Sequence, residues 1–362
     1  MKHRLVLLSH RLPEAAGRPF RNQMPKQWTP GSSAASRLSR QQRMGERANY
    51  VLVEDGHFRL FFRHHFMPRS KWYPKKWELY SSTWRARILD SDLAPGPEAA
   101  IRCILDQKRR ERQEWYDDIE CEGAALIDRS RQVLLFFMYV QDFAHRAALL
   151  AVLARTWRAW HVQWAFDGTS DLAAYVGLDR AVVRSGGVML GGPLRQALAD
   201  LMIVADDDEI DQLVTVRHAS GQVDGYGFRG DIFGVLRYGP EMVELLPADA
   251  RVTACQFPRS GIHIDLVARE LGLWAIDPLT GIDEWLPDEW PGWRIELWGD
   301  QYQEHIARCA VQVKDWDFGA GLETLAKRLE VAPPYANTHA KPEELERARE
   351  VIASLRGNRR NH

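Results

Sequence analysis

Two stretches of this sequence repeat one pattern. Residues 155–174 read RTWRAWHVQWAFDGTSDLAA, and residues 288–307 read DEWPGWRIELWGDQYQEHIA. In each, two tryptophans stand three positions apart, a strand-like run follows, and an aspartate comes seven positions after the second tryptophan. Tryptophan is rare and bulky, so a shared spacing of tryptophans predicts two copies of one structural unit.

Further anchors recur in the same order. The segment GPEAAI at 96–101 corresponds to GPEMVE at 239–244, and the pair Ile127-Asp128 corresponds to Ile264-Asp265. Alternating apolar runs predict strands, and apolar residues three and four apart predict helices. The sequence therefore predicts an α+β fold with two tandem copies of a ββ-α-ββ-(α)-β-α unit, followed by C-terminal helices.

Composition and turn signals divide the 362 residues into five parts. The predicted parts are a basic, disordered extension at 1–43, a first α+β repeat at 44–185, a linker with an acidic run at 186–212, a second repeat at 213–312, and C-terminal helices with a basic tail at 313–362. The extension carries nine basic residues and one acidic residue, so the rest of the chain is acidic. It is interpreted as a dispensable segment before a start at Met44, with a transit peptide or a nucleic-acid-binding arm as alternatives.

The bulk chemistry favours a cytoplasmic protein. The four cysteines have no paired or zinc-like spacing, which favours reduced thiols. No apolar run approaches the length that a membrane span needs. A net charge of -1 gives no general attraction for nucleic acid, so a nucleic-acid partner is not expected.

The segment MGERANYVLVEDG, which begins at Met44, resembles the opening of an uncharacterised family of bacterial proteins. The segments EGAALID, WAFDGTSDLAAYVG and WPGW are similar to later parts of that pattern, over roughly residues 44 to 312. The family has no known activity, cofactor or catalytic residue, so the resemblance implies only that Met44 is a natural start. The basic stretch after His64 departs from the pattern.

Asp167 and Asp300 are a matched pair at strand-to-helix junctions. Asp300 stands three residues before Gln303, which is the spacing of a capping box. We therefore interpret both aspartates as helix caps rather than catalytic groups.

A row of carboxylates is the main candidate for catalysis. On a strand, Asp118, Glu120 and Glu122 would share one face, roughly 7 Å between neighbours. Crowded carboxylates raise one another's pKa or bind a divalent metal, and the other repeat has no such row. The alternative interpretation, a solvated face that steers a basic partner, is the one we prefer.

Two further clusters are candidates for binding. His57, His64 and His65 lie in a basic region without the carboxylates or cysteines of a metal site. The loop KWYPKKW mixes lysines with aromatic rings that could stack on a partner. We expect binding residues at Trp72, Tyr73, Trp77, His64 and His65, and neither a metal nor a cofactor.

The common catalytic motifs are missing: the sequence has no GxxxxGK[ST], GxSxG or HExxH. We therefore expect a non-enzymatic protein that binds another protein, as an immunity-type or other neutralising partner. The alternatives are a metal-dependent hydrolase or nuclease that uses the Asp118, Glu120 and Glu122 row, and nucleic-acid binding through the basic arm. The sequence does not identify the partner or the oligomeric state.

Overall fold

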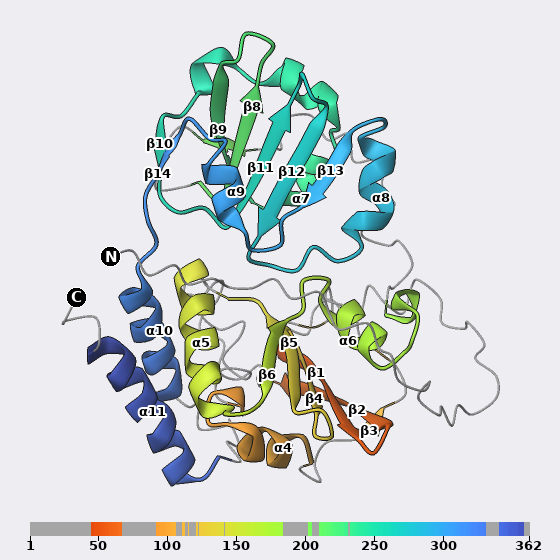
Figure 1. The fold of residues 1–362 in the computed structure, drawn as a ribbon, viewed down its shortest axis with the longest axis vertical. Helices are drawn as coiled ribbons and strands as arrows, with labels where there is room; N and C mark the ends of the chain where they lie inside the picture. The colour runs from red at the N-terminus through yellow and green to blue at the C-terminus, as the bar shows by residue number, and fades with distance from the viewer. Residues whose placement is uncertain are drawn as a thin grey trace.

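The computed structural model contains two β-sheets, one above the other in Figure 1, with helices around them. It describes residues 45–66, 92–105, 111–112, 115, 121, 123–140, 142–183, 202–204, 210–230, 232–330 and 340–357. The predicted extension at 1–43 lies outside these residues. We call residues 45–183 the first half and residues 202–313 the second half.

The first sheet mixes parallel and antiparallel pairs. Its strands are β1 (Gly45–Glu54), β2 (His57–Phe66), β3 (Glu111–Arg112), β4 (Gly123–Asp128), β5 (Val133–Met138) and β6 (His161–Trp164), in the order β3-β2-β1-β4-β5-β6. β1 and β2 form an antiparallel hairpin, and β1 is parallel to β4. β4 and β5 are antiparallel, and β5 is parallel to β6.

The second sheet has the same pattern. Its strands are β7 (Met202–Val204), β8 (Gln212–Arg217), β9 (Val223–Arg229), β11 (Ser260–Asp265), β12 (Glu270–Ala275) and β13 (Arg294–Leu297), in the order β13-β12-β11-β8-β9-β7. β8 and β9 form an antiparallel hairpin, β8 is parallel to β11, β11 and β12 are antiparallel, and β12 is parallel to β13. A separate ladder joins β10 (Ala254–Cys255) to β14 (Gln312–Val313).

Five strands of each sheet correspond one to one in order and direction: β1, β2, β4, β5 and β6 match β8, β9, β11, β12 and β13. The predicted α+β fold with a repeated unit is confirmed. The sixth strand of each sheet differs in chain order: β3 comes after the β1–β2 hairpin, whereas β7 comes before the β8–β9 hairpin.

The helices also correspond. Those of the first half are α4 (Pro97–Leu105), α5 (Phe143–Thr156), α6 (Thr169–Tyr175) and the 3-10 helix η3 (Arg180–Val182); those of the second half are α7 (Ile232–Leu236), the 3-10 helices η6 (Pro240–Leu245) and η7 (Ala248–Ala250), α8 (Ile282–Glu289) and α9 (Tyr302–Ile306). By chain order, η6 takes the place of α4, α8 that of α5, and α9 that of α6. Residues 202–204, which lie in the predicted linker, pair with β9 as an edge strand.

The repeated Gly-Pro-Glu begins a helix next to the end of a later helix, α5 in the first half and α8 in the second. Gly96 and Gly239 both have positive φ, at 115° and 65°. A Cβ on Gly96 would lie 3.2 Å from the carbonyl oxygen of Thr156, and one on Gly239 would lie 2.5 Å from that of Glu289. Only glycine combines this φ with so close an approach, and the following proline suits the first helical turn.

The paired tryptophans hold the same contact in both halves. Trp157 packs edge to face on Trp160 with ring centroids 5.1 Å apart, and its Nε1 donates to the carbonyl of Leu93 at 2.8 Å. Trp290 packs on Trp293 at 5.0 Å, and its Nε1 donates to the carbonyl of Leu236 at 2.7 Å. Each buried indole thus ties the turn after a helix to the segment before the Gly-Pro-Glu.

The repeated Ile-Asp ends a strand in a tight turn. Asp128 accepts a hydrogen bond from the backbone of Arg131, and Asp265 accepts two, from Val267 and Ala268, each at 2.9 Å. Aspartate side chains stabilise turns in this way by replacing a backbone acceptor.

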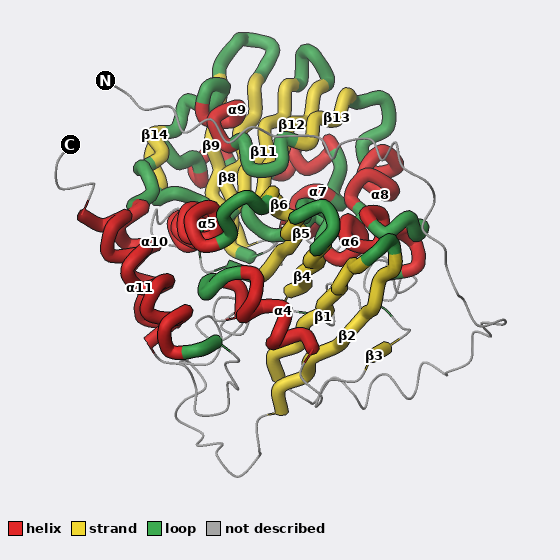
Figure 2. Tube along the Cα trace, turned by 60° about the horizontal axis from the view of Figure 1, so that its bottom comes forward, coloured by secondary structure: helices red, strands yellow, loops and turns green. Residues whose placement is uncertain are grey.

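The C-terminal helices return to the first half. α10 (Phe318–Glu330) and α11 (Pro342–Gly357), both predicted from the sequence, lie beside α5 in Figures 1 and 2. A Cβ on Gly321 would lie 2.1 Å from the carbonyl of Ala144, so α10 and α5 are in backbone contact. The apolar core of the first half also includes Trp274, Ile276 and Trp298 of the second half, so the core is continuous across the two halves.

We expect Trp157→Phe and Trp290→Phe to lower the free energy of unfolding by similar amounts, about 1–3 kcal/mol each. Each substitution removes a buried N–H···O bond and leaves a small void. Chemical denaturation followed by far-UV circular dichroism measures both. A large loss in one variant and none in the other would contradict equivalent roles.

Candidate functional site

Six of the residues predicted as candidates lie outside the described residues: Asp118, Glu120, Glu122, Trp72, Tyr73 and Trp77. The carboxylate row and the aromatic loop therefore stay predictions. His64 and His65 lie on β2, in register with Arg47 and Glu46 of β1.

His57 does not share a site with His64. It is exposed at the beginning of β2, after the turn at Asp55 and Gly56. Seven strand residues separate the two histidines, which corresponds to roughly 23 Å along the sheet.

Three general properties concern the described residues alone. Within them, no three histidine, cysteine, aspartate or glutamate side chains are grouped as metal ligands. None of the helices described is long and apolar enough to cross a membrane. Of the four cysteines, Cys103, Cys121 and Cys255 are buried and Cys309 is partly buried.

The junction between the halves centres on a buried arginine. Arg146 lies in the first turn of α5, with a side chain 2% exposed. Its Nη2 donates to Oδ2 of Asp300 at 3.0 Å, and its Nη1 donates to the carbonyl of Ile276 at 3.4 Å. The guanidinium also lies 4.3 Å from the ring of Trp164 and 5.1 Å from that of Phe166. Burial lowers the pKa of Arg146 to about 10, and Asp300 opposes this shift.

A reciprocal contact comes from the matched aspartate. Oδ1 of Asp167 accepts a hydrogen bond from the backbone N–H of Gly281 at 2.9 Å, and Oδ2 pairs with Arg180. Gly281 is the residue that caps α8. Each aspartate therefore contacts the beginning of the corresponding helix in the other half: Asp300 contacts α5, and Asp167 contacts α8.

The interpretation of these aspartates as helix caps was wrong. The cap residues of α6 and α9 are Gly168 and Gln301, and neither helix has a side-chain cap. A capping pattern is local in sequence, whereas the partners of Asp167 and Asp300 lie 114 and 154 residues away.

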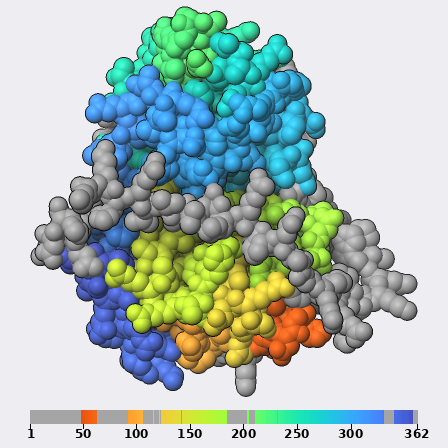
Figure 3. All heavy atoms as spheres, viewed as in Figure 1, coloured from red at the N-terminus to blue at the C-terminus, as the bar shows by residue number. Residues whose placement is uncertain are grey.

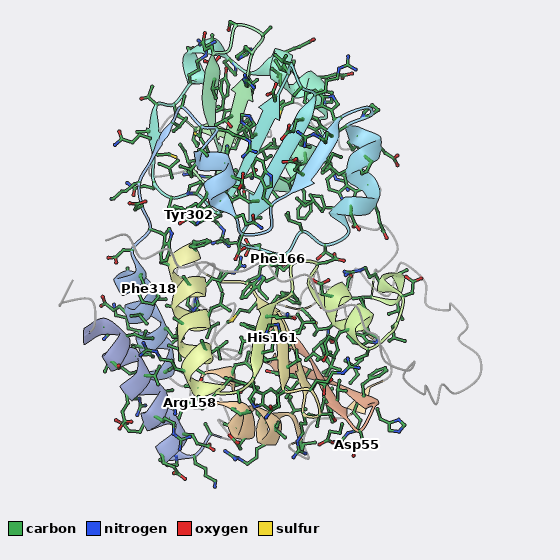
Figure 4. The ribbon with its side chains drawn as sticks, viewed as in Figure 1. Asp55, Arg158, His161, Phe166, Tyr302 and Phe318 are labelled. Carbon is green, nitrogen blue, oxygen red and sulfur yellow. The ribbon has the colours of Figure 1, made fainter. Side chains whose placement is uncertain are left out.

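Aromatic rings fill the rest of the junction. Phe143 at the beginning of α5 packs on Tyr302, Phe257 and Trp316, with ring centroids 5.0–5.3 Å apart. Figure 4 shows Tyr302 and Phe166 between the two sheets, and in Figure 3 the blue residues near 300 lie above the yellow-green residues near 150. The junction is a packed apolar contact with one buried ion pair.

A buried polar network lies on the second sheet. Thr215 of β8 is in register with His263 of β11, and His305 of α9 lies over them. The hydroxyl of Thr215 is 2.9 Å from Nδ1 of His263 and 2.8 Å from Nε2 of His305. Nε1 of Trp274 donates to Nδ1 of His305 at 3.1 Å. None of the four side chains is more than 3% exposed.

Glycines on the sheet make room for this network. A Cβ on Gly261 would lie 2.1 Å from Nδ1 of His305, and one on Gly272 would lie 2.0 Å from the ring of Trp298. The large side chains of α9 and of the segment before it therefore rest directly on the strand backbone.

Burial is the main cause that lowers the pKa of both histidines, to about 4 for His263 and about 3 for His305. Both imidazoles are neutral at physiological pH. Nδ1 of His263 and Nε2 of His305 contact the threonine hydroxyl, and Nδ1 of His305 accepts from Trp274, so this buried arrangement holds α9 on the sheet.

The first half has aliphatic residues in the corresponding places. Strand register matches Thr215 with Val51 and His263 with Leu126, and the spacing from the matched aspartates matches His305 with Leu172. Val51, Leu126 and Leu172 are fully buried. The unit folds with an apolar contact at this place, so the polar network is a particular property of the second half.

The chain matches none of the protein-family models, curated proteins or solved structures with which it was compared.

We expect Asp300→Ala to lower the free energy of unfolding by about 3–5 kcal/mol, because it leaves the buried Arg146 guanidinium without a counter-charge. Glu304→Ala is the matched control: it breaks an ion pair with Arg308 at 2.7 Å that is 35–46% exposed, which contributes less than about 1 kcal/mol. Denaturant unfolding compares them, and equal losses would contradict the role of the buried pair.

Thr215→Val is expected to cost about 1–3 kcal/mol, because it leaves buried imidazole nitrogen atoms without a partner. The triple variant Thr215→Val, His263→Leu and His305→Leu copies the first half at these three positions and should recover part of that loss, since only the indole N–H of Trp274 then loses its acceptor. A thermal or denaturant melt of the two variants decides this. A triple variant that is less stable than the single one would contradict it.

Proposed function

We propose that the protein is a non-enzymatic binding protein, and that its partner is a basic protein. The observation that carries the proposal is an acidic helical layer on the second half. Residues 238–250 and 270–293, which include η6 and α8, contain no lysine or arginine. Their acidic side chains at the surface of the two helices are Glu241, Glu244, Asp283, Glu284 and Asp288, all exposed, and the partly buried Glu289.

The basic residues of the second half are largely engaged by its own acids. Residues 213–312 contain 8 arginines, no lysine and 15 acidic residues, a net charge of -7. Residues 44–185 carry +2. Arg217, Arg251, Arg259, Arg294 and Arg308 form ion pairs with Asp265, Asp224, Asp277, Glu270 and Glu304. The carboxylates of η6 and α8 therefore belong to a half with an excess of negative charge, and such an excess accelerates association with a cationic surface.

Apolar groups lie among these carboxylates. Leu245 at the end of η6 is 52% exposed. Trp285 of α8 is partly buried, with the guanidinium of Arg237 4.5 Å from its ring. In the proposed interface, Trp285 and Leu245 are the apolar anchors that supply affinity, and the carboxylates around them supply orientation.

A neutralising, immunity-type role is the finer form of the proposal: the acidic layer would cover a cationic surface that the partner needs for its activity. We also infer that the two halves arose by internal duplication, which the shared strand order, tryptophan pair and Gly-Pro-Glu support. One copy then acquired the acidic layer. The proposal places the protein in the cytoplasm, with which four cysteines without paired or zinc-like spacing agree.

The test isolates partners with the full chain and then measures binding of each purified partner. Neutralising Glu241, Glu244 and Glu284 to Gln and Asp288 to Asn should weaken binding about tenfold or more and reduce its salt dependence. For an immunity-type protein, the complex should also suppress the activity of the partner.

The matched control neutralises four exposed glutamates of the C-terminal helices, Glu330, Glu343, Glu346 and Glu350, to Gln. It changes the net charge by the same amount, so its affinity should stay within about twofold of the parent. Equal weakening in both variants, or partners that are not basic, would contradict a specific role for the η6 and α8 layer.

A further inference from the structure

The hydrogen bonds around His305 have a fixed direction. An indole N–H only donates, so Trp274 requires an unprotonated Nδ1 on His305. The proton of the neutral imidazole must then lie on Nε2, which donates to the hydroxyl of Thr215. The threonine in turn has its own proton to donate, and Nδ1 of His263 is the nearer acceptor, at 2.9 Å against 3.4 Å for the carbonyl of Ile262.

A second proton on His305 is incompatible with this arrangement. It would place an N–H on Nδ1 directly against the N–H of Trp274, with no acceptor between them. A second proton on His263 would take the place of the threonine proton at Nδ1 and leave the hydroxyl only its longer contact with the carbonyl of Ile262. The network keeps all its contacts only while both imidazoles are neutral.

The element that this network holds also makes the junction. His305 fixes α9 to the second sheet, while Tyr302 in the first turn of α9 packs on Phe143 of the first half. Asp300, two residues before α9, binds Arg146. Undocking of α9 from the second sheet therefore disturbs the contacts that join the halves.

We propose that Trp274, His305, Thr215 and His263 form an acid-sensitive latch, which docks α9 at neutral pH and releases it, loosening the junction between the halves, as the surroundings become acidic. The proposal stands independently of the binding function.

Charged groups face the latch from four elements. Arg308, in the turn after α9, lies 5.0 Å from the ring of Trp298 and pairs with Glu304. Arg217 of β8 and Asp265 of β11 form an ion pair at 2.8 Å. Glu296 of β13 accepts a hydrogen bond from Nε1 of Trp298 at 3.1 Å.

These surroundings set the direction of the pH effect. Burial is the largest cause of both pKa shifts. Arg308 and Arg217 also lower the pKa of His263, whereas Asp265 raises it. His263 and Arg308 also lower the pKa of His305. Released histidines return to their ordinary pKa of about 6.5. Docking is therefore complete above that pH and is progressively lost as pH falls towards the folded values of about 4 and 3.

The internal repeat argues that packing alone does not require titratable groups here. Leu172 of α6, Val51 and Leu126 take the corresponding positions in the first half, where all three are buried in one core cluster. The polar latch thus adds a pH response to a contact that aliphatic residues make equally well.

The experiment follows amide hydrogen exchange of the full chain between pH 7.5 and 4.5, corrected for the intrinsic exchange rate. The open population of residues 302–306 should rise below pH 6.5 by up to about tenfold per pH unit for each histidine that takes a proton on opening. Residues 169–175 of α6, the matched segment, should show a much smaller change.

Variants assign the response to the latch. His305→Leu, or the triple variant Thr215→Val, His263→Leu and His305→Leu if the single one is unstable, should abolish the pH dependence at 302–306. His218→Gln, which removes a histidine bound to Asp224 outside the latch, should retain it. The proposal is overturned if the triple variant keeps the parent's pH dependence, or if α9 and α6 of the parent open together at every pH.

Discussion

The architecture depends on a charge placed where water cannot reach it. Arg146 lies at the junction with the second half. Its guanidinium binds a carboxylate and a carbonyl of that half and lies over the ring of Trp164 in the first half. A buried cation is costly unless all its partners are in place. The pair therefore favours one geometry for the junction, in which Phe143 also packs on Tyr302.

The junction is reciprocal because the unit is repeated. Asp167 and Asp300 occupy the same place in their halves and reach the corresponding helix of the other half. The partners differ, however: one is a backbone N–H and the other a buried guanidinium. The same divergence recurs on the sheets, where Val51, Leu126 and Leu172 of one half correspond to Thr215, His263 and His305 of the other. A shared framework thus carries two different sets of side chains, and the functional proposals rest on the set in the second half.

The sequence distinguishes the latch residues from their counterparts in the first half. Among the differences between the aligned strands AALID and GIHID is a histidine in place of a leucine, and the helices that follow the matched aspartates have His305 in place of Leu172. Both differences put a polar residue where the other repeat is apolar, and catalytic motifs do not include this signal. The sequence does not mark Arg146 in this way, because an arginine in the first turn of a helix is usually exposed and nothing local indicates that it is buried.

The sequence by itself determined the repeated unit, the strand and helix order, and the positions of the paired tryptophans, the Ile-Asp turns and the Gly-Pro-Glu. These features depend on apolar periodicity and on contacts that recur within each copy. Only the tertiary structure decided what Asp167 and Asp300 bind, that residues 202–204 form an edge strand, and that His263 and His305 meet at one hydroxyl. Each of these depends on a partner far away in the chain, and local spacing carries no information about which distant surfaces come together when the two halves pack.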